Sequence, residues 1–354
     1  MPIAIDKPSS YFNTKLYTGN GTTNAITGVG HKPNLLWVKI RGNTYDHRLF
    51  DSVRGVSSKL FSNTTYAEVT NTTNDNLVSF DTDGFTFGAS SSTNGSNENG
   101  SSFVGWSWRG SDSSAVTNTS GSITSTESAN TTSGFSIVSY TGTGSNATVG
   151  HGLGVAPKMV IVKSRSNSTD WIVGNTNIGW TKLLRLNTTD AQETNNYFND
   201  TAPTSSVFSL GTTVNVNGSG YTYVAYCFAE VKGFSKFGSY TGNGSTDGTF
   251  VYTGFKPAMI ILKRTDAAGY DWRLLDNKRN TYNVVSTVLF PNTTEADLTN
   301  SANYVDFLSN GFKCNTTGAG SNASGGTYIY AAFAENPFVS SKGIPTTARW
   351  FGLS

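Results

Sequence analysis

The chain is poor in charge and has no long apolar run. Charged residues make up 14% of its 354 residues and the net charge is +2, whereas ordinary soluble domains carry roughly 25% charged residues. Without a basic cluster the chain offers little to a phosphate backbone, so we expect no nucleic-acid partner. No apolar run reaches the ~20 residues of a membrane span, and residues 1–12 have neither a charged leader nor an apolar core. We therefore expect no membrane insertion.

Histidine and cysteine are too sparse for metal chemistry. His31, His47 and His151 have no histidine or cysteine partner at metal-ligand spacing. Cys227 and Cys314 fall far apart in the chain, and we expect two buried thiols rather than a disulfide. No Gly-x-Ser-x-Gly elbow occurs, and no glycine loop leads into a helix with the residues that hold phosphate. The sequence predicts no metal, no cofactor and no catalytic residue.

Glycine, asparagine, serine, threonine and aromatic residues are abundant instead. The chain has 38 glycines, and 12% of its residues are aromatic. This mixture weakens helices and favours strands and tight turns, and no apolar stripe has helical spacing. With 36% hydrophobic residues the chain can bury a core, which excludes wholesale disorder. The composition predicts an all-β fold.

One turn sequence occurs three times, as YTGNG at 17–21 and 240–244 and as YTGTG at 140–144. At matching distances each copy is followed by a proline that opens an apolar run, by an NTT triplet, and by a segment of alternating aromatic residues. Self-similarity at fixed spacing is the signature of tandem duplication. We predict three tandem β-sandwich units, jelly-roll or lectin-like, and a C-terminal tail, over residues 1–110, 111–233, 234–340 and 341–354.

The closing segment of each repeat predicts a central strand. In YVAYCFAE at 223–230, Val224, Tyr226 and Phe228 share one face, while Tyr223 and Cys227 share the other, and both faces are apolar. The short apolar runs after Pro33, Pro157 and Pro257 also predict buried strands. The Ser/Thr-rich lead-in at 111–134 fits a flexible linker and an exposed strand equally well.

A lysine follows each of these prolines by six residues, and an aspartate follows the lysine by seven or eight. A catalytic residue seldom needs three copies in one chain, whereas a Lys–Asp bridge across strands or a side-chain cap on a turn does. We therefore treat these residues as structural candidates: Lys39, Asp46, Lys163, Asp170, Lys263 and Asp271. Repeat 2 has VGNTNIGW where the others have FDSVRG and LDNKRN, so a role for Asp51 with Arg54, or Asp276 with Arg279, does not extend to it.

The segments DKPSSYFNTKLYTGNGT, GHKPNLLWVKIR, GFSIVSYTGTGSNATVGHGLGVAPKMVIVKSR and DGFTFG…FVGWSWRG resemble a repeat domain of tail-associated and other virion proteins of marine bacteriophages. The resemblance covers nearly the whole chain. It implies an all-β build and a place on the virion surface after synthesis in the host cytoplasm, and it brings no catalytic residues. We expect a non-enzymatic structural protein, a tail-associated appendage or fibre component that engages the host surface.

Two alternatives stay open, a capsid-decorating or cement protein that stabilises the shell, and a polysaccharide-degrading enzyme that uses two carboxylates. The expected partners are other virion proteins, further copies of the same chain, and a host-surface glycan. Two smaller expectations concern aromatic residues. Arg349, Trp350 and Phe351 form a candidate subunit-contact tail, and we expect three tryptophans to be buried: Trp37, Trp108 and Trp272.

Overall fold

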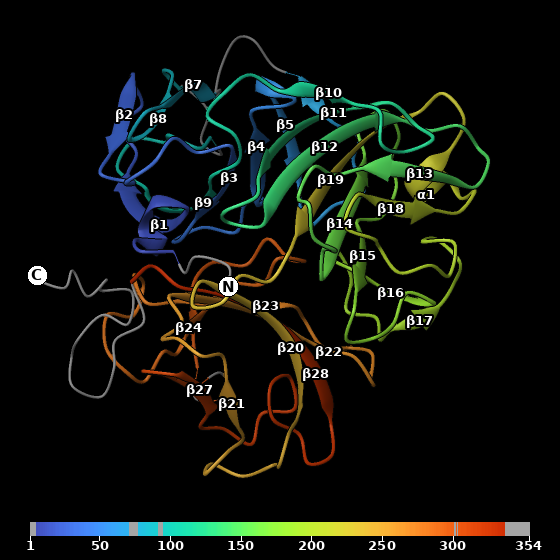
Figure 1. The fold of residues 1–354 in the computed structure, drawn as a ribbon. Coiled ribbons are helices and arrows are strands. Elements are labelled where there is room, and N and C mark those ends of the chain that lie inside the picture. The colour runs from blue at the N-terminus through green and yellow to red at the C-terminus, as the bar shows by residue number, and fades with distance from the viewer. Residues whose placement is uncertain (1–4, 71–76, 91–94, 301, 303, 337–354) are drawn as a thin grey trace, which may run out of the picture.

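The computed structural model describes residues 5–70, 77–90, 95–300, 302 and 304–336, and strands dominate it. Figure 1 shows three lobes around a common centre, in the order of the three predicted repeats, which we call units 1, 2 and 3. Among the described residues the helical elements are the 3-10 turn η1 (Pro8–Ser10) and the four-residue α1 (Val214–Asn217). The all-β prediction is confirmed.

Each unit holds a larger antiparallel sheet and smaller sheet pieces. In unit 1 the order of the larger sheet is β1 (Phe12–Thr18), β9 (Ser102–Trp108), β3 (Leu35–Ile40), β4 (Arg48–Asp51), β5 (Gly55–Phe61) and β6 (Val69–Thr70). The smaller sheet of unit 1 is β2 (Asn24–Thr27), β8 (Gly84–Phe87) and β7 (Leu77–Asp81).

Unit 2 repeats this plan with two strands added at one edge. Its larger sheet runs β10 (Val116–Asn118), β11 (Ser125–Asn130), β12 (Phe135–Thr141), β19 (Thr222–Phe228), β14 (Met159–Ser164), β15 (Ile172–Asn175), β16 (Lys182–Arg185) and β17 (Glu193–Thr194). The smaller sheet pairs β13 (Ala147–Gly150) with β18 (Val207–Leu210). The added β10 and β11 come from the Ser/Thr-rich lead-in, so the structure favours the strand over the linker.

In unit 3 the larger sheet runs β20 (Ser235–Thr241), β28 (Thr327–Phe333), β22 (Met259–Arg264) and β23 (Arg273–Asp276). The smaller sheet is β21 (Phe250–Tyr252), β27 (Gly311–Cys314) and β26 (Val305–Leu308), and β24 (Thr287–Val288) pairs with β25 (Leu298–Thr299). The larger-sheet strands β1, β12 and β20 occupy equivalent places, as do β9, β19 and β28 next to them.

The central strands are apolar on both faces because each face meets a different core. In β19, Val224, Tyr226 and Phe228 point into a core that all three units share, while Tyr223 and Cys227 point into a core of unit 2 alone. This is the alternation that the sequence predicted, and β19 lies between β12 and β14, as expected of a central strand. The strands β3, β14, β22 and β28 divide their side chains between the shared core and their unit's own core in the same way.

The shared core fills the centre of the molecule, where the three larger sheets face one another. Trp37, Trp108 and Trp272 lie in it and expose 3%, 2% and 2% of their surface, which confirms the prediction that they are buried. A unit on its own would leave this inner sheet face in water, at a cost of roughly 25 cal/mol for each Å² of apolar surface. The hydrophobic effect therefore holds the three units together as one body.

The repeated turn is held by a buried asparagine that none of the sequence patterns above singled out. In unit 1 the side-chain oxygen of Asn97 accepts a hydrogen bond from the backbone N–H of Asn20 at 3.0 Å, and its side-chain nitrogen donates to the backbone carbonyls of Thr22 and Gly88. The second glycine of the turn, Gly21, has a φ of +69°, a conformation that glycine adopts without strain and most other residues rarely adopt. Asn217 and Asn322 clamp the other two turns through equivalent bonds.

Candidate functional site

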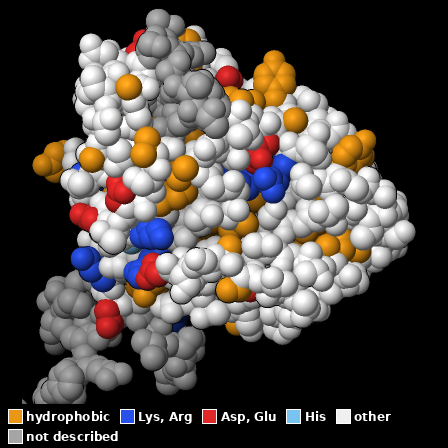
Figure 2. Space-filling model, turned by 90° about the horizontal axis from the view of Figure 1, so that it is seen from above, with side chains coloured by type: hydrophobic (Ala, Val, Ile, Leu, Met, Phe, Trp, Pro, Cys, Tyr) orange, Lys and Arg blue, Asp and Glu red, His pale blue; other side chains and the backbone are white. Residues whose placement is uncertain are grey.

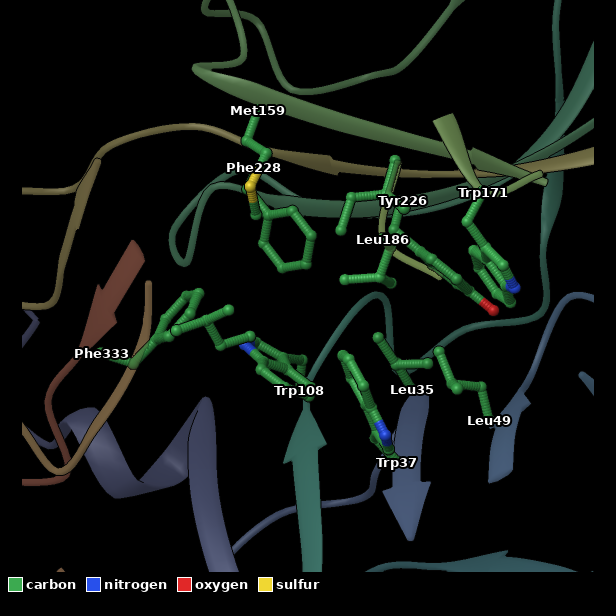
Figure 3. A pocket seen from close by; sticks show the side chains of 12 residues that line it. Leu35, Trp37, Leu49, Trp108, Met159, Trp171, Leu186, Tyr226, Phe228 and Phe333 are labelled. Atoms are coloured by element: carbon green, nitrogen blue, oxygen red, sulfur yellow. The ribbon is translucent and has the colours of Figure 1, made fainter. Parts of the chain in front are cut away.

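A small apolar cavity lies in the middle of the shared core. Its volume is about 20 Å³. Figure 3 shows Leu35 and Trp108 of unit 1 facing Met159 and Phe228 of unit 2 across it, with Phe333 of unit 3 at one side. All its lining side chains are apolar or aromatic, and a void of this size without polar partners does not retain water. The cavity is a packing defect at the junction of three units, and it is too small for a substrate.

The three lysine candidates are buried behind their strands. Lys39, Lys163 and Lys263 expose 0% of their surface. Lys39 donates to the carbonyls of Ile40 and Asn43 at 2.7 and 2.9 Å, and the others donate to carbonyls in the same way. Burial lowers the pKa of each of these lysines to about 8. Each amine therefore anchors the loop that follows its strand. Among the described residues, none of the three lysines forms an ion pair with the aspartate of its own repeat.

The three aspartate candidates each hold the asparagine of the NTT triplet. The Asn63 amide donates to Asp46 at 2.6 Å, and its carbonyl accepts the backbone N–H of His47 at 3.0 Å. Asn187 and Asn292 make the same two bonds, with the Asp170–Trp171 and Asp271–Trp272 pairs. This side-chain cap explains why aspartate, ring and NTT recur together, and it uses the carboxylates structurally.

The ring that follows each aspartate reaches into a neighbouring unit. The Trp171 indole donates to the Phe61 carbonyl of unit 1 at 2.8 Å, and the Trp272 indole donates to the Arg185 carbonyl of unit 2 at 2.8 Å. His47 of unit 1 lies near the backbone of Phe290 in unit 3, and the Ser62 hydroxyl of unit 1 donates to the Pro291 carbonyl of unit 3 at 2.7 Å. The contacts run from unit 2 to 1, 3 to 2 and 1 to 3, so the three units close into a ring with approximate threefold symmetry.

Backbone hydrogen bonds also join each pair of units. We call the three surfaces where two units meet seam 1–2, seam 3–1 and seam 2–3. The amides of Glu68, Asp297 and Gln192 donate to the carbonyls of Arg165, Arg41 and Thr265, at 2.7, 2.7 and 2.9 Å, one in each seam. Each seam therefore has an equivalent backbone bond. The side chains around this bond differ from seam to seam.

Seam 1–2 contains a buried ionic network. Asp51 and Arg54 have fully buried side chains and pair at 2.5 Å. The Tyr226 hydroxyl of unit 2 donates to Asp51 at 2.8 Å, and Glu68 bridges Arg54 to Arg165 of unit 2. Burial opposes ionisation of Glu68, but hydrogen bonds and charge from Arg165 and Arg54 hold its pKa below the usual value. All the carboxylates of this network therefore have cationic partners.

Seam 3–1 repeats the network with a different donor. Asp276 and Arg279 pair at 2.6 Å with fully buried side chains, and the Trp106 indole of unit 1 donates to Asp276 at 3.2 Å. Asp297 pairs with Arg279 at 3.0 Å and with Arg41 of unit 1 at 2.7 Å. Trp106 and Tyr226 occupy the same place in β9 and β19, which accounts for their matching roles.

Seam 2–3 lacks these charges. Asn175 stands where the other units have Asp51 and Asp276, and its amide nitrogen has no hydrogen-bond partner among the described residues. The position in β28 that matches Tyr226 and Trp106 is Ala331, which has no donor. Unit 2 therefore lacks the carboxylate, and unit 3 lacks the hydrogen-bond donor that would face it across the same seam.

The outer surface carries little charge. On the face in Figure 2, charged side chains form small groups, in some of which acidic and basic side chains adjoin, and uncharged surface lies between the groups. A polar groove of about 360 Å³ runs along seam 2–3. The described residues contain no group of three or more side chains fit to hold a metal ion, and no helix among them is long and apolar enough to cross a membrane. Cys227 and Cys314 are buried and free, as predicted, and burial raises the pKa of Cys314 to about 11.

Within the part of the chain that the structure describes, unit 3 alone exposes two aromatic rings on its smaller sheet. Phe250 and Tyr252 on β21 expose 45% and 62% of their surface, while Val251 between them points inward. The matching positions are Ala25 and Thr27 on β2, and Thr148 and Gly150 on β13. No motif marked these rings, but comparing the repeats position by position detects them. The tail candidates Arg349, Trp350 and Phe351 lie outside the described residues.

The fold and its contacts define a class, an all-β protein of three repeated units closed around one core. The chain matches the model of a family described as a domain of unknown function, DUF7483, over residues 7–337, and it belongs to that family. The match spans all three units in one stretch. No curated protein and no solved structure matches the chain.

Proposed function

We propose that the protein is a non-enzymatic structural component of a phage particle. In this proposal it consists of three tandem β-sandwich units of jelly-roll or lectin-like type, is displayed on the virion surface, and acts as a tail-associated appendage that engages the host surface. Its partners are other virion proteins, further copies of the chain and a host-surface glycan. The resemblance of the sequence motifs to a repeat domain of phage virion proteins supports a place on the particle. The low surface charge suits contacts with other proteins and with sugars.

The observation that carries the proposal is the closure of three units around one core. The carboxylates that recur in the repeats cap turns, and the buried Asp–Arg pairs lie in two of the seams. These groups therefore stabilise the fold. A rigid block with sheet faces turned outward is suited to assembly and to presenting a binding surface.

Copy number per particle tests the proposal. Quantitative mass spectrometry of purified virions should find the chain at a few to a few dozen copies relative to the major capsid protein. A ratio near one per capsid subunit would instead support the capsid-decorating alternative. Absence from purified particles, or release of reducing ends from host polysaccharide by the pure chain, would overturn the structural role.

A further inference from the structure

We propose that the outer face of the smaller sheet of unit 3 is a binding platform for a neutral glycan. The platform comprises Phe250, Tyr252, Asp306, Leu308 and Lys313. The inference gives the proposed host-surface role a ligand class and a site, and it rests on that role.

The two rings are presented side by side. They lie two positions apart on β21, about 7 Å along the strand, and therefore project from the same face. Gly311 lies opposite Tyr252 in β27, and a Cβ placed on it would stand 2.1 Å from the Val251 carbonyl oxygen and 3.0 Å from Cε2 of Phe250. The matching Gly84 of unit 1 meets the Ile26 carbonyl in the same way, so the close approach of the two strands requires the glycine. The Phe250 ring lies beside this bare stretch of backbone.

Polar groups flank the rings. On the neighbouring strands of the same face stand Lys313, which pairs with Asp247, and Asp306, which accepts a hydrogen bond from the Asn315 amide at 2.6 Å. A pyranose offers a face of C–H groups that packs on an aromatic ring and hydroxyls around its rim that bond to such side chains. Within the platform Asp306 balances Lys313, and Asp247 beside Lys313 adds a second carboxylate at its edge. This excess of negative charge disfavours acidic polysaccharides and favours neutral ones.

The size of the patch selects a glycan over a protein partner. A Phe or Tyr side chain presents about 150–250 Å² when fully exposed, and these two rings are only about half exposed. A stable protein interface needs roughly 800 Å² from each partner. Two rings with a polar rim are therefore too small a contact for a protein and sufficient for one or two sugar rings.

The other units show that the rings are dispensable for the fold. In unit 1 the same face carries Ala25 and Thr27, and its polar side chains satisfy one another, with Ser79 and Thr86 donating to Asp81 at 2.6 and 2.7 Å. In unit 2 the lead-in pairs along the edge of β13, where Ile123 bridges to Val149 and Ser122 bonds to Thr148. The repeat fold therefore does not require rings at these two positions, and exposed apolar groups rimmed by polar ones mark binding sites.

The test is binding of the purified chain to an array of bacterial polysaccharides, neutral and acidic. We expect binding to neutral polymers, and a loss of about tenfold or more in apparent affinity in Phe250→Ala/Tyr252→Ala. Tyr282→Ala and Tyr66→Ala, which remove exposed tyrosines elsewhere, should bind as the unaltered chain does. Grafting the rings onto unit 1 with Ala25→Phe/Thr27→Tyr should raise binding about twofold or more by adding a second platform.

Three results would overturn the platform: no binding to any polysaccharide, binding only to acidic polymers, or equal binding by the double variant. Unchanged thermal unfolding of the double variant shows that any loss is not misfolding. The copy number in virions is a separate measurement. If the chain is present in virions at the proposed copy number but binds no glycan, the platform proposal is wrong and the proposed structural role stands.

Discussion

The charged seams and the neutral seam perform the same task with different chemistry. In seams 1–2 and 3–1 a buried Asp–Arg pair receives a donor from the neighbouring unit, whereas seam 2–3 has Asn175 facing a unit whose matching position is Ala331. All three seams keep the backbone hydrogen bond and the shared apolar core. Closure of the ring therefore depends on the buried apolar core and on the backbone hydrogen bonds. The ion pairs are present in two seams only, so closure does not require them.

The difference also shows that the buried charges come as a set. A buried arginine without its carboxylate, or a carboxylate without its donor, costs more than the intact pair contributes. Seam 2–3 has lost acid, base and donor together, since Asn175, Ile178 and Ala331 replace them. The two kinds of seam are alternative complete solutions, and a mixture of them is unfavourable.

The largest expected effect comes from breaking one pair. Asp51→Ala leaves Arg54 buried with Glu68 as its remaining carboxylate, and we expect a loss of about 3–5 kcal/mol in the free energy of unfolding. Asn175→Ala, the matched change in the neutral seam, should cost about 1 kcal/mol. Urea unfolding followed by tryptophan fluorescence measures both.

The conversion of seam 1–2 to the neutral type sharpens the test. Asp51→Asn/Arg54→Ile/Tyr226→Ala installs the residues of seam 2–3 at three positions and leaves Glu68 paired with Arg165. It should be less destabilising for each group removed than Asp51→Ala alone. Equal losses in Asp51→Ala and Asn175→Ala would show that the seams do not differ as described.

A smaller effect is expected from the cross-seam hydroxyl. Tyr226→Phe removes the hydrogen bonds that its hydroxyl makes with the Asp51 carboxylate and the Arg54 guanidinium, and it should cost roughly 1.5–3 kcal/mol, the range for bonds to charged groups. Tyr140→Phe removes a bond of 2.7 Å to the neutral carbonyl of Val216 and should cost about 1 kcal/mol. Thermal unfolding in parallel compares them, and a larger cost for Tyr140→Phe would contradict the role given to Asp51.

The smallest expected effect is a loss of folding stability as the pH falls, and it involves His47 in seam 3–1. Burial, with Lys39 and Arg279 nearby, lowers the pKa of His47 well below 6.5. The unfolded chain then takes up the proton first as the pH falls, so His47 contributes stability above about pH 6.5 that is lost below it. Burial lowers the pKa of His31 to about 4, and that of His151 falls too, so they contribute in the same direction.

His47→Gln removes one of these three groups and keeps an acceptor for the Trp37 indole, which donates to His47 at 3.0 Å. We expect the variant to lose less stability between pH 7 and pH 5 than the unaltered chain does, whatever its stability at pH 7. Unfolding midpoints across this range give the slope, and an unchanged slope would show that His47 does not titrate on unfolding.

Much of the local structure follows from the sequence because strand periodicity and turn chemistry are local. The alternation in 223–230 predicted β19 with both its faces, and the repeated prolines marked the starts of β3, β14 and β22. The capping role of Asp46 and its two counterparts was one of two alternatives, and the recurring NTT triplet was its partner. Asn97 was missed, although an asparagine stands six residues before the first aromatic residue of each closing strand.

Local patterns predicted the three repeats, the strands and the inward rings, since each depends on neighbours within a few residues or on a repeated spacing. Tertiary packing closes the units around one core, joins Asp51 to Tyr226 and Asp276 to Trp106, and turns Phe250 and Tyr252 outward. Those contacts join residues that are up to 175 positions apart. Which faces meet depends on how three apolar surfaces pack at once, and no local pattern encodes that choice.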